Sequence, residues 1–158
     1  MNLELLYGSG ADVAAAQQRI DNLKQTFIKN ENAEPEYVFS SSGRAEILGN
    51  HTDHNHGLVL VASISCDVIA AVKKSNDNIV KICSEGYPPV VVDISNLSVV
   101  PEEKGSSNAL ARGVAKAIVD RGFKVKGFTA YTTSNIFKGA GVSSSAAFEV
   151  LVAEIFNT

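Results

Sequence analysis

A glycine- and serine-rich loop between a β-rich run and a helical pattern constrains the fold of this chain most. Phe123 to Thr133 reads as a strand, the loop Lys138 to Ser145 follows, and a helix is predicted from Ala146 to about Ile155. In such a unit the backbone N–H groups and the positive end of the helix meet at the loop. The loop can therefore hold phosphate oxygens.

The pattern before this unit mixes strands with helices. Apolar residues at three- and four-residue intervals predict a helix from about Asp12 to Ile28 and another around Leu110 to Ile118. β-Rich runs predict five further strands: Tyr37–Ser40, Gly57–Val61, Cys66–Val72, Ile79–Cys83 and Val90–Ile94. Strands outnumber helices, so the sequence predicts an α+β domain.

The two cysteines, Cys66 and Cys83, both lie in β-rich runs without CxxC spacing. We expect these runs to form a hairpin through Ser75 to Asn78, in a register that places Cys66 opposite Tyr87. A disulfide is thereby disfavoured, and free thiols suit a cytosolic protein.

Composition excludes several classes of function. With 158 residues, of which 45% are hydrophobic, the chain can bury the core of one domain. A net charge of -3 without long charge runs gives no reason to bind nucleic acid or an anionic membrane. No run approaches the roughly 20 apolar residues that span a bilayer, and Met1 to Leu6 do not resemble a signal peptide. We expect a cytoplasmic protein.

The chain stops directly after its last predicted helix, at Thr158. That helix has an apolar side with nothing after it to cover it, formed by Phe148, Leu151, Val152 and Ile155. We therefore expect a truncated chain with an exposed helix face.

The loop Gly139 to Ser145 departs from the common nucleotide motifs. It lacks the lysine that closes a Walker A loop and the third glycine of GxGxxG. Its serine hydroxyls could donate to phosphate or ligate Mg²⁺, which prefers oxygen ligands. A plain turn with Ser143 or Ser144 as the N-cap of the helix is the structural alternative.

The segment Gly43 to Gly57 is dense in polar and ionisable side chains. His51, Asp53, His54 and His56 could ligate a metal, but their order lacks the i, i+4 histidine pair of helical zinc sites. Asn, His and Asp together also offer the donors and acceptors that sugar hydroxyls need. A solvated loop is the third interpretation.

Both segments resemble the signatures of the galactokinase branch of the GHMP kinase superfamily. The family's G-R-x-N-L-I-G-E-H-x-D-Y-N-x-G appears here as GRAEILGNHTDHNHG, from Gly43 to Gly57. Its G-x-G-L-S-S-S-A appears as GAGVSSSA, from Gly139 to Ala146. The helix that contains Asn108 to Val114 is also similar to the helix before the family's phosphate loop.

The resemblance implies that residues 1–158 form the GHMP kinase N-terminal domain, an α+β fold like domain 2 of ribosomal protein S5. In that fold a mixed sheet has helices packed on one face. It further implies ATP-dependent phosphorylation of the anomeric hydroxyl of galactose by a full-length parent. The family's catalytic aspartate, second magnesium carboxylate and third motif would lie beyond Thr158. This chain is therefore expected to be inactive without the C-terminal half.

The resemblance also assigns site residues. Arg44 would stabilise charge on the transferring phosphoryl group, as a planar, permanently charged fork can. The residues expected to contact the sugar are Asn50, His51, Thr52 and Asp53. Those expected to contact ATP are Ser84, Gly139, Ala140, Gly141, Val142, Ser143, Ser144 and Ser145. Ser145 would also ligate Mg²⁺, and the partners would be galactose and ATP.

Two positions depart from the family signature. Asn50 stands where the family has Glu, and an amide donates as well as accepts, so the preferred sugar could be a relative of galactose. His54 stands where the family has Tyr. Two other functions stay open: a sugar-binding or regulatory protein that has lost catalysis, and a metal-dependent hydrolase.

Overall fold

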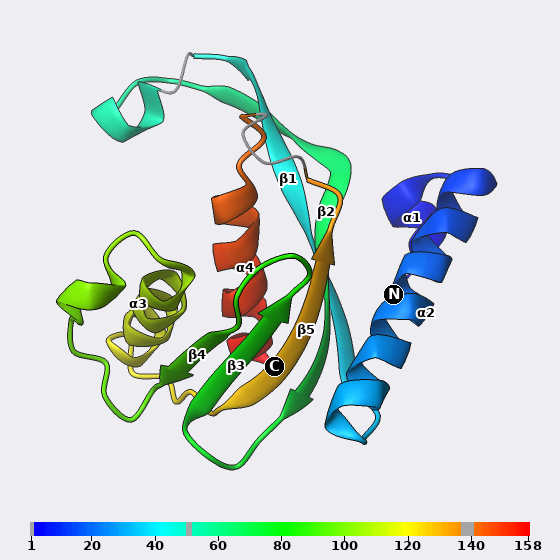
Figure 1. The fold of residues 1–158 in the computed structure, drawn as a ribbon. Helices are drawn as coiled ribbons and strands as arrows, with labels where there is room; N and C mark the ends of the chain where they lie inside the picture. The colour runs from blue at the N-terminus through cyan, green and yellow to red at the C-terminus, as the bar shows by residue number, and fades with distance from the viewer. Residues whose placement is uncertain (1, 50–51, 137–140) are drawn as a thin grey trace.

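The computed structural model of the protein describes residues 2–49, 52–136 and 141–158. In these ranges a five-stranded sheet has the order β1-β2-β5-β3-β4 (Figure 1). The strands are β1 (Tyr37–Leu48), β2 (Leu60–Lys74), β3 (Ile79–Ser84), β4 (Val90–Asp93) and β5 (Phe128–Ser134). β3 and β5 run parallel, whereas the other neighbouring pairs are antiparallel. The sheet is therefore mixed, as predicted.

The predicted hairpin between the two cysteine-containing strands is wrong, because β5 lies between β2 and β3. The β2–β3 turn bends around the start of β5: Ser75 donates from its backbone N–H to the Gly127 carbonyl, and Gly127 donates to the carbonyl of Asp77. A Cβ on Gly127 would lie 2.5 Å from the Ile79 carbonyl oxygen, so only glycine fits between the two arms. Cys66 and Cys83 are both free, as expected.

Two strands are longer than the sequence indicated. β1 continues past Ser40 through the first part of the polar segment, where Arg44 pairs with Ser63 and Glu46 with Val61. The predicted strands at 57–61 and 66–72 are parts of one strand, β2. The ladder between β1 and β2 changes register between Ser42 and Arg44, which marks a bulge at the start of the signature.

The helices lie on both faces of the sheet, so the expectation of helices on one face is wrong. α1 (Leu3–Tyr7) and α2 (Ala11–Glu31) cover one face, and α3 (Ser107–Val119) and α4 (Ser144–Asn157) cover the other (Figure 1). β2 is apolar on both sides: Ile69 and Ala71 pack under α2, whereas neighbouring residues pack towards α3 and α4. A strand that is buried on both faces needs cover on both.

The apolar side of α4 is not left exposed, contrary to the sequence-based expectation. Leu151, Val152 and Ile155 are buried in the core formed with the sheet and α3. The rings of Phe156 and Phe128 stack edge to face with centroids 5.3 Å apart. Cover for this helix comes from strands earlier in the chain.

Two short 3-10 helices complete the described elements, η1 (Thr52–Asn55) between β1 and β2 and η2 (Pro101–Glu103) before α3. None of the helices in the described ranges has the length and apolar character needed to cross a bilayer.

Candidate active site

The two signature segments contact each other where β1 passes the loop that precedes α4. The backbone N–H of Arg44 donates to the carbonyl of Val142 at 3.1 Å. Gly43 is buried, and a Cβ there would lie 3.0 Å from the same carbonyl oxygen. β1 carries the start of the sugar signature, our name for Gly43 to Gly57. It is thus in van der Waals contact, at Val142, with the phosphate loop, our name for Gly139 to Ser145.

The described part of the phosphate loop turns sharply into α4. Gly141 has a φ of 71°, and Ser143, at the N-cap position, has φ 61° and ψ 44°. A left-handed backbone costs a non-glycine residue roughly 1 to 2 kcal/mol, and such strain gathers at functional sites. Gly139 and Ala140 lie outside the described residues.

The start of α4 is suited to an anion. The Ser143 side chain makes no capping hydrogen bond, and the first turn contains no acidic residue. The first N–H groups of a helix have no partner within it, and the helix dipole is positive there. Ser144 and Ser145 are exposed on this turn. The capping alternative is therefore not supported at Ser143.

Arg44 is half-buried on β1, next to this loop. Its Nε is buried and has no hydrogen-bond acceptor among the described residues. Buried donors are nearly always paired, so an unpaired one needs an explanation. An anion held at this place would satisfy it.

The described part of the segment expected to contact the sugar begins η1 (Thr52–Asn55), at the tip of the β1–β2 ribbon, which projects from the sheet (Figure 1). The exposed Thr52 donates its hydroxyl hydrogen to the Gly49 carbonyl at 2.8 Å. Asn50 and His51 lie outside the described residues, and so does the side chain of Asp53. The expected convergence of these groups on Arg44 stays a prediction.

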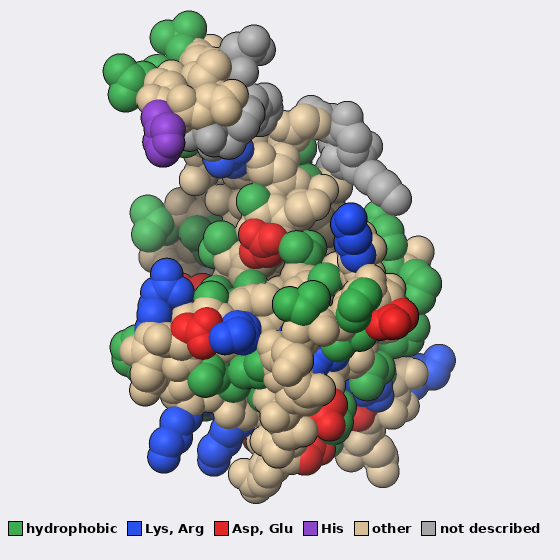
Figure 2. All heavy atoms as spheres, turned by 90° about the vertical axis from the view of Figure 1, so that its left-hand side faces the viewer, with side chains coloured by type: hydrophobic (Ala, Val, Ile, Leu, Met, Phe, Trp, Pro, Cys, Tyr) green, Lys and Arg blue, Asp and Glu red, His purple; other side chains and the backbone are tan. Residues whose placement is uncertain are grey.

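The projecting tip is also rich in exposed apolar side chains. Leu58 is 94% exposed, and Ile47, Leu48 and Leu60 are each more than half exposed. Figure 2 shows hydrophobic side chains on this tip, above the body of the molecule. Monomeric proteins seldom leave such side chains clustered in water.

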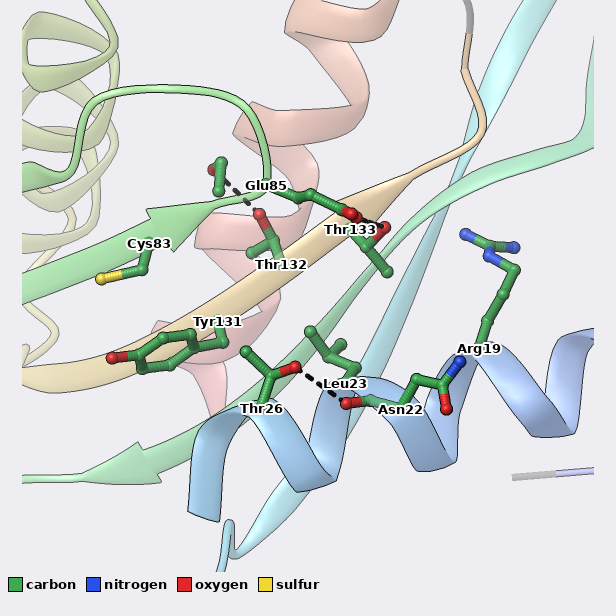
Figure 3. A pocket seen from close by; sticks show the side chains of 10 residues that line it. Arg19, Asn22, Leu23, Thr26, Cys83, Glu85, Tyr131, Thr132 and Thr133 are labelled. Carbon is green, nitrogen blue, oxygen red and sulfur yellow. Dashed lines mark hydrogen bonds between the residues drawn. The ribbon is translucent and has the colours of Figure 1, made fainter. Parts of the chain in front are cut away.

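Ser84 ends β3 and lines a cavity of about 430 Å³ between α2 and the ends of β3 and β5 (Figure 3). Thr132 donates to the Ser84 hydroxyl at 2.8 Å, and Thr133 donates to the carboxylate of Glu85 at 2.6 Å. β3 and β5 are parallel, so Ser84 lies at the same edge of the sheet from which the chain leaves β5 for the phosphate loop.

The carboxylate of Asp67 is buried, with the residue 2% exposed, and it was not among the site residues expected from the sequence. It accepts hydrogen bonds from the Tyr7 hydroxyl, from Ser40 at 2.6 Å and from Arg19 at 2.9 Å. Burial and then the bond to Asp67 raise the pKa of the Tyr7 phenol. The one signal in the sequence is an acidic residue inside the apolar run 66–72.

The backbone of Asp67 pairs with Asn135, which lies between β5 and the second signature. Its N–H donates to the Asn135 side chain at 2.7 Å, and the Asn135 N–H donates to its carbonyl at 3.1 Å. Asn135 follows β5 directly, where the chain departs towards the phosphate loop. Asp67 therefore joins the N-terminal helices to the strand end before that loop.

The described side chains contain no cluster of three or more His, Cys, Asp or Glu residues able to hold an ion. His51 and the side chains of Asp53 and His54 lie outside the described residues, so the hypothesis of a metal site there stays open.

Comparison with known proteins identifies the family. The galactokinase galactose-binding signature matches residues 25–74, which include all of β1 and β2. Galactokinase of Clostridium tetani is 35% identical over 138 residues, or 87% of this chain and 35% of the relative. Galactokinase of Streptomyces coelicolor is 34% identical over 125 residues, or 79% of this chain and 32% of the relative. The chain belongs to the galactokinase family.

Solved structures agree with this assignment. Lactococcus lactis galactokinase in complex with galactose aligns with a TM-score of 0.72 and 27% identity, covering 85% of this chain and 35% of that one. Methanococcus jannaschii mevalonate kinase aligns with a TM-score of 0.61 at 13% identity, which shows the shared fold alone. The α+β fold of the GHMP kinase N-terminal domain is confirmed. This galactokinase-family chain spans about a third of the length of the curated relatives that it matches.

Proposed function

We propose that the full-length protein is a galactokinase, which transfers the γ-phosphoryl group of ATP to the anomeric hydroxyl of galactose and releases ADP. The observation that carries this proposal is the junction of the two signatures, where the Arg44 N–H donates to the Val142 carbonyl at 3.1 Å. Phosphoryl transfer depends on holding donor and acceptor in line. A direct bond between the two binding segments serves that need.

Arg44 is proposed to stabilise the transition state. Its guanidinium is always charged and offers a planar fork of donors to phosphate oxygens. The buried Nε without an acceptor among the described residues supports this role. A donor already in place costs no reorganisation as charge develops on the transferring group.

The phosphates of ATP are proposed to bind at the start of α4, along Gly139 to Ser145. The uncapped first turn, free of acidic residues, fits an anion there. The exposed hydroxyl of Ser145 is a hard oxygen ligand of the kind that Mg²⁺ prefers. Bound Mg²⁺ would neutralise negative charge on the phosphate oxygens. Ser84, at the same edge of the sheet, is proposed to lie beside the nucleotide.

The sugar is proposed to contact the tip of the β1–β2 ribbon through Asn50, His51, Thr52 and Asp53. Thr52 already donates its hydroxyl hydrogen to Gly49. Towards a sugar it can then act only as an acceptor. The amide and carboxylate nearby would supply the remaining donors and acceptors.

The full-length protein is proposed to carry its catalytic base and second magnesium carboxylate beyond Thr158, and to work in the cytosol. The relatives are about three times longer than the segment that they share with this chain. Residues 1–158 alone are therefore proposed to be inactive.

A coupled assay of ADP formation by the full-length protein tests the proposal. ADP should form with MgATP and galactose, but not with 1-deoxygalactose, which lacks the anomeric hydroxyl. Galactose binding in calorimetry without any ADP formation would instead identify a sugar-binding protein that has lost catalysis. Equal ADP formation with both sugars would contradict the assignment of the accepting hydroxyl.

A further inference from the structure

A side chain at Gly43 would crowd two neighbouring residues in the fold. It is buried where β1 passes the phosphate loop. A Cβ on Gly43 would lie 3.0 Å from the carbonyl oxygen of Val142 and 3.1 Å from Cδ1 of Ile64. Real Cβ atoms rarely come so close to a neighbour, so an added methyl group would move the loop backbone, the isoleucine or both.

Backbone conformation does not account for this glycine. Gly43 is absent from the described glycines with a positive φ, whereas Gly141 in the facing loop has a φ of 71°. Another residue could adopt the backbone of Gly43 without strain. The requirement at this position is therefore for space.

The space at Gly43 sets the distance between the two signatures. The next residue, Arg44, donates its backbone N–H to Val142 at 3.1 Å, and the β1–β2 register changes between Ser42 and Arg44. The bulge and the missing side chain together let β1 approach the loop closely enough for this bond. A methyl group on Gly43 would separate the same two segments.

We propose that Gly43 is a positioning residue that fixes the spacing between Arg44 and the phosphate loop. It touches no substrate and acts through the Val142 backbone. This inference rests on the proposed kinase function, because the spacing matters only if phosphate binds at the loop and Arg44 acts on it. A misplacement of about 1 Å caused by a mutation outside the reacting groups can lower the rate about a hundredfold.

Steady-state kinetics of the full-length Gly43→Ala variant test the role in catalysis. We expect kcat to fall by about tenfold or more, whereas the KM for galactose stays within about threefold, because the sugar-contacting tip is not displaced. Gly113→Ala in α3 is the matched control: a Cβ there meets no atom within 4 Å. Its kinetics should equal those of the wild type, and an equal kcat for Gly43→Ala would overturn the proposal.

Ile64→Ala separates loop displacement from overpacking, because it removes both side-chain atoms of Ile64 that a methyl group on Gly43 would meet, Cδ1 at 3.1 Å and Cγ1 at 3.2 Å. In the Gly43→Ala/Ile64→Ala double variant the contact with Val142 persists, so kcat should stay low. Full recovery of kcat would show that Ile64 alone was crowded and would overturn the proposal. The double variant also provides the test if Gly43→Ala alone folds poorly, because it relieves the core.

Amide hydrogen exchange provides a readout that does not depend on activity. In the 158-residue chain, the Arg44 amide should exchange about tenfold faster in Gly43→Ala than in Gly113→Ala, because its bond to Val142 is weakened. Unchanged protection of this amide would refute the inference even if the protein is a galactokinase. Faster exchange in a protein without kinase activity would refute the proposed function and leave the spacing role of Gly43 standing.

Discussion

The backbone N–H of Arg44 and the carbonyl of Val142 form a hydrogen bond of 3.1 Å between segments that are far apart in the sequence. Arg44 belongs to the sugar signature on β1, and Val142 belongs to the loop that leads into α4. The bond involves only backbone atoms, so it fixes the relative position of the two segments whatever their side chains bind.

Replacing Asp67 by Asn should destabilise the chain by about 2 to 4 kcal/mol, because it removes a buried carboxylate and leaves the half-buried Arg19 guanidinium without its charged partner. Urea unfolding followed by circular dichroism measures this change. The control is Asp120→Asn, which removes an exposed i, i+4 pair with Lys116 and should cost less than about 0.5 kcal/mol. Similar costs for the two variants would contradict the structural role of Asp67.

Glu31 should make stability depend on pH in the acid range. A hydrogen bond from Lys81, at 2.7 Å, lowers the pKa of the Glu31 carboxyl below its ordinary value of 4.5. A lowered folded-state pKa gives stability that is present above pH 4.5 and is lost as the pH falls through the folded-state value.

The expected size of this effect is about 0.5 kcal/mol, since Lys81 is well exposed. Glu31→Gln should remove it, so the difference in unfolding free energy between wild type and variant should shrink from pH 6 to pH 3. The control Glu34→Gln changes an exposed carboxyl and should show no such trend. A constant difference for Glu31→Gln across this range would refute the pairing.

Arg112→Lys should lower stability by about 1 to 2 kcal/mol although the charge is kept. The guanidinium of Arg112 donates from Nε and Nη2 to the two carboxylate oxygens of Glu103, at 2.8 and 2.7 Å. Its Nη1 also donates to the backbone carbonyls of Asp93 and Asn96. A lysine cannot hold this fork. The melting temperature of Arg112→Lys measures this loss. The control is Lys116→Arg on the same helix, which should leave the melting temperature nearly unchanged.

Asn50→Glu should change the ranking of galactose against analogues modified at C6 or C2. A carboxylate only accepts hydrogen bonds, whereas the amide also donates. The variant and the wild type should therefore differ in how well the side chain at this position binds the hydroxyl and acetamido groups of the sugars. The ratios of kcat/KM between sugars should shift severalfold in the full-length protein, with the KM for ATP nearly unchanged. Equal changes for every sugar would show that this position does not contact the substrate.

Much of the fold followed from local patterns. The α2, α3 and α4 helices lie where apolar periodicity placed them, because each buries one stripe of side chains. The strand order could not be predicted in this way, because the turn Ser75–Asn78 looks locally like a hairpin turn. Its hydrogen bonds to Gly127 form only when β5, a strand much later in the chain, lies between β2 and β3. The cover of both sheet faces was likewise a property of the assembled sheet.

Part of the candidate site was likewise inferred from local sequence patterns, and part depends on the assembled fold. The chemistry proposed for it was inferred from two motifs, since arginine, serine and glycine at these spacings suit phosphate. The hydrogen-bonding role of Asp67 could not be predicted from the sequence, because its partners Tyr7, Arg19 and Ser40 come from three separate elements. The junction of Arg44 with Val142 needed a bulge in β1. A glycine within a strand can signal a bulge, but the predicted strand ended at Ser40, so Gly43 was not recognised as part of it.

Arg44, held at the meeting point of the two signatures, is proposed to act on the transferring phosphoryl group. The most direct test is kcat of the full-length Arg44→Ala variant with galactose and MgATP, measured by ADP release and compared with the wild type. Loss of a preorganised cation should lower kcat by about 10²- to 10³-fold, with the affinity for galactose measured by calorimetry nearly unchanged. A kcat within about twofold of the wild type would contradict the claim.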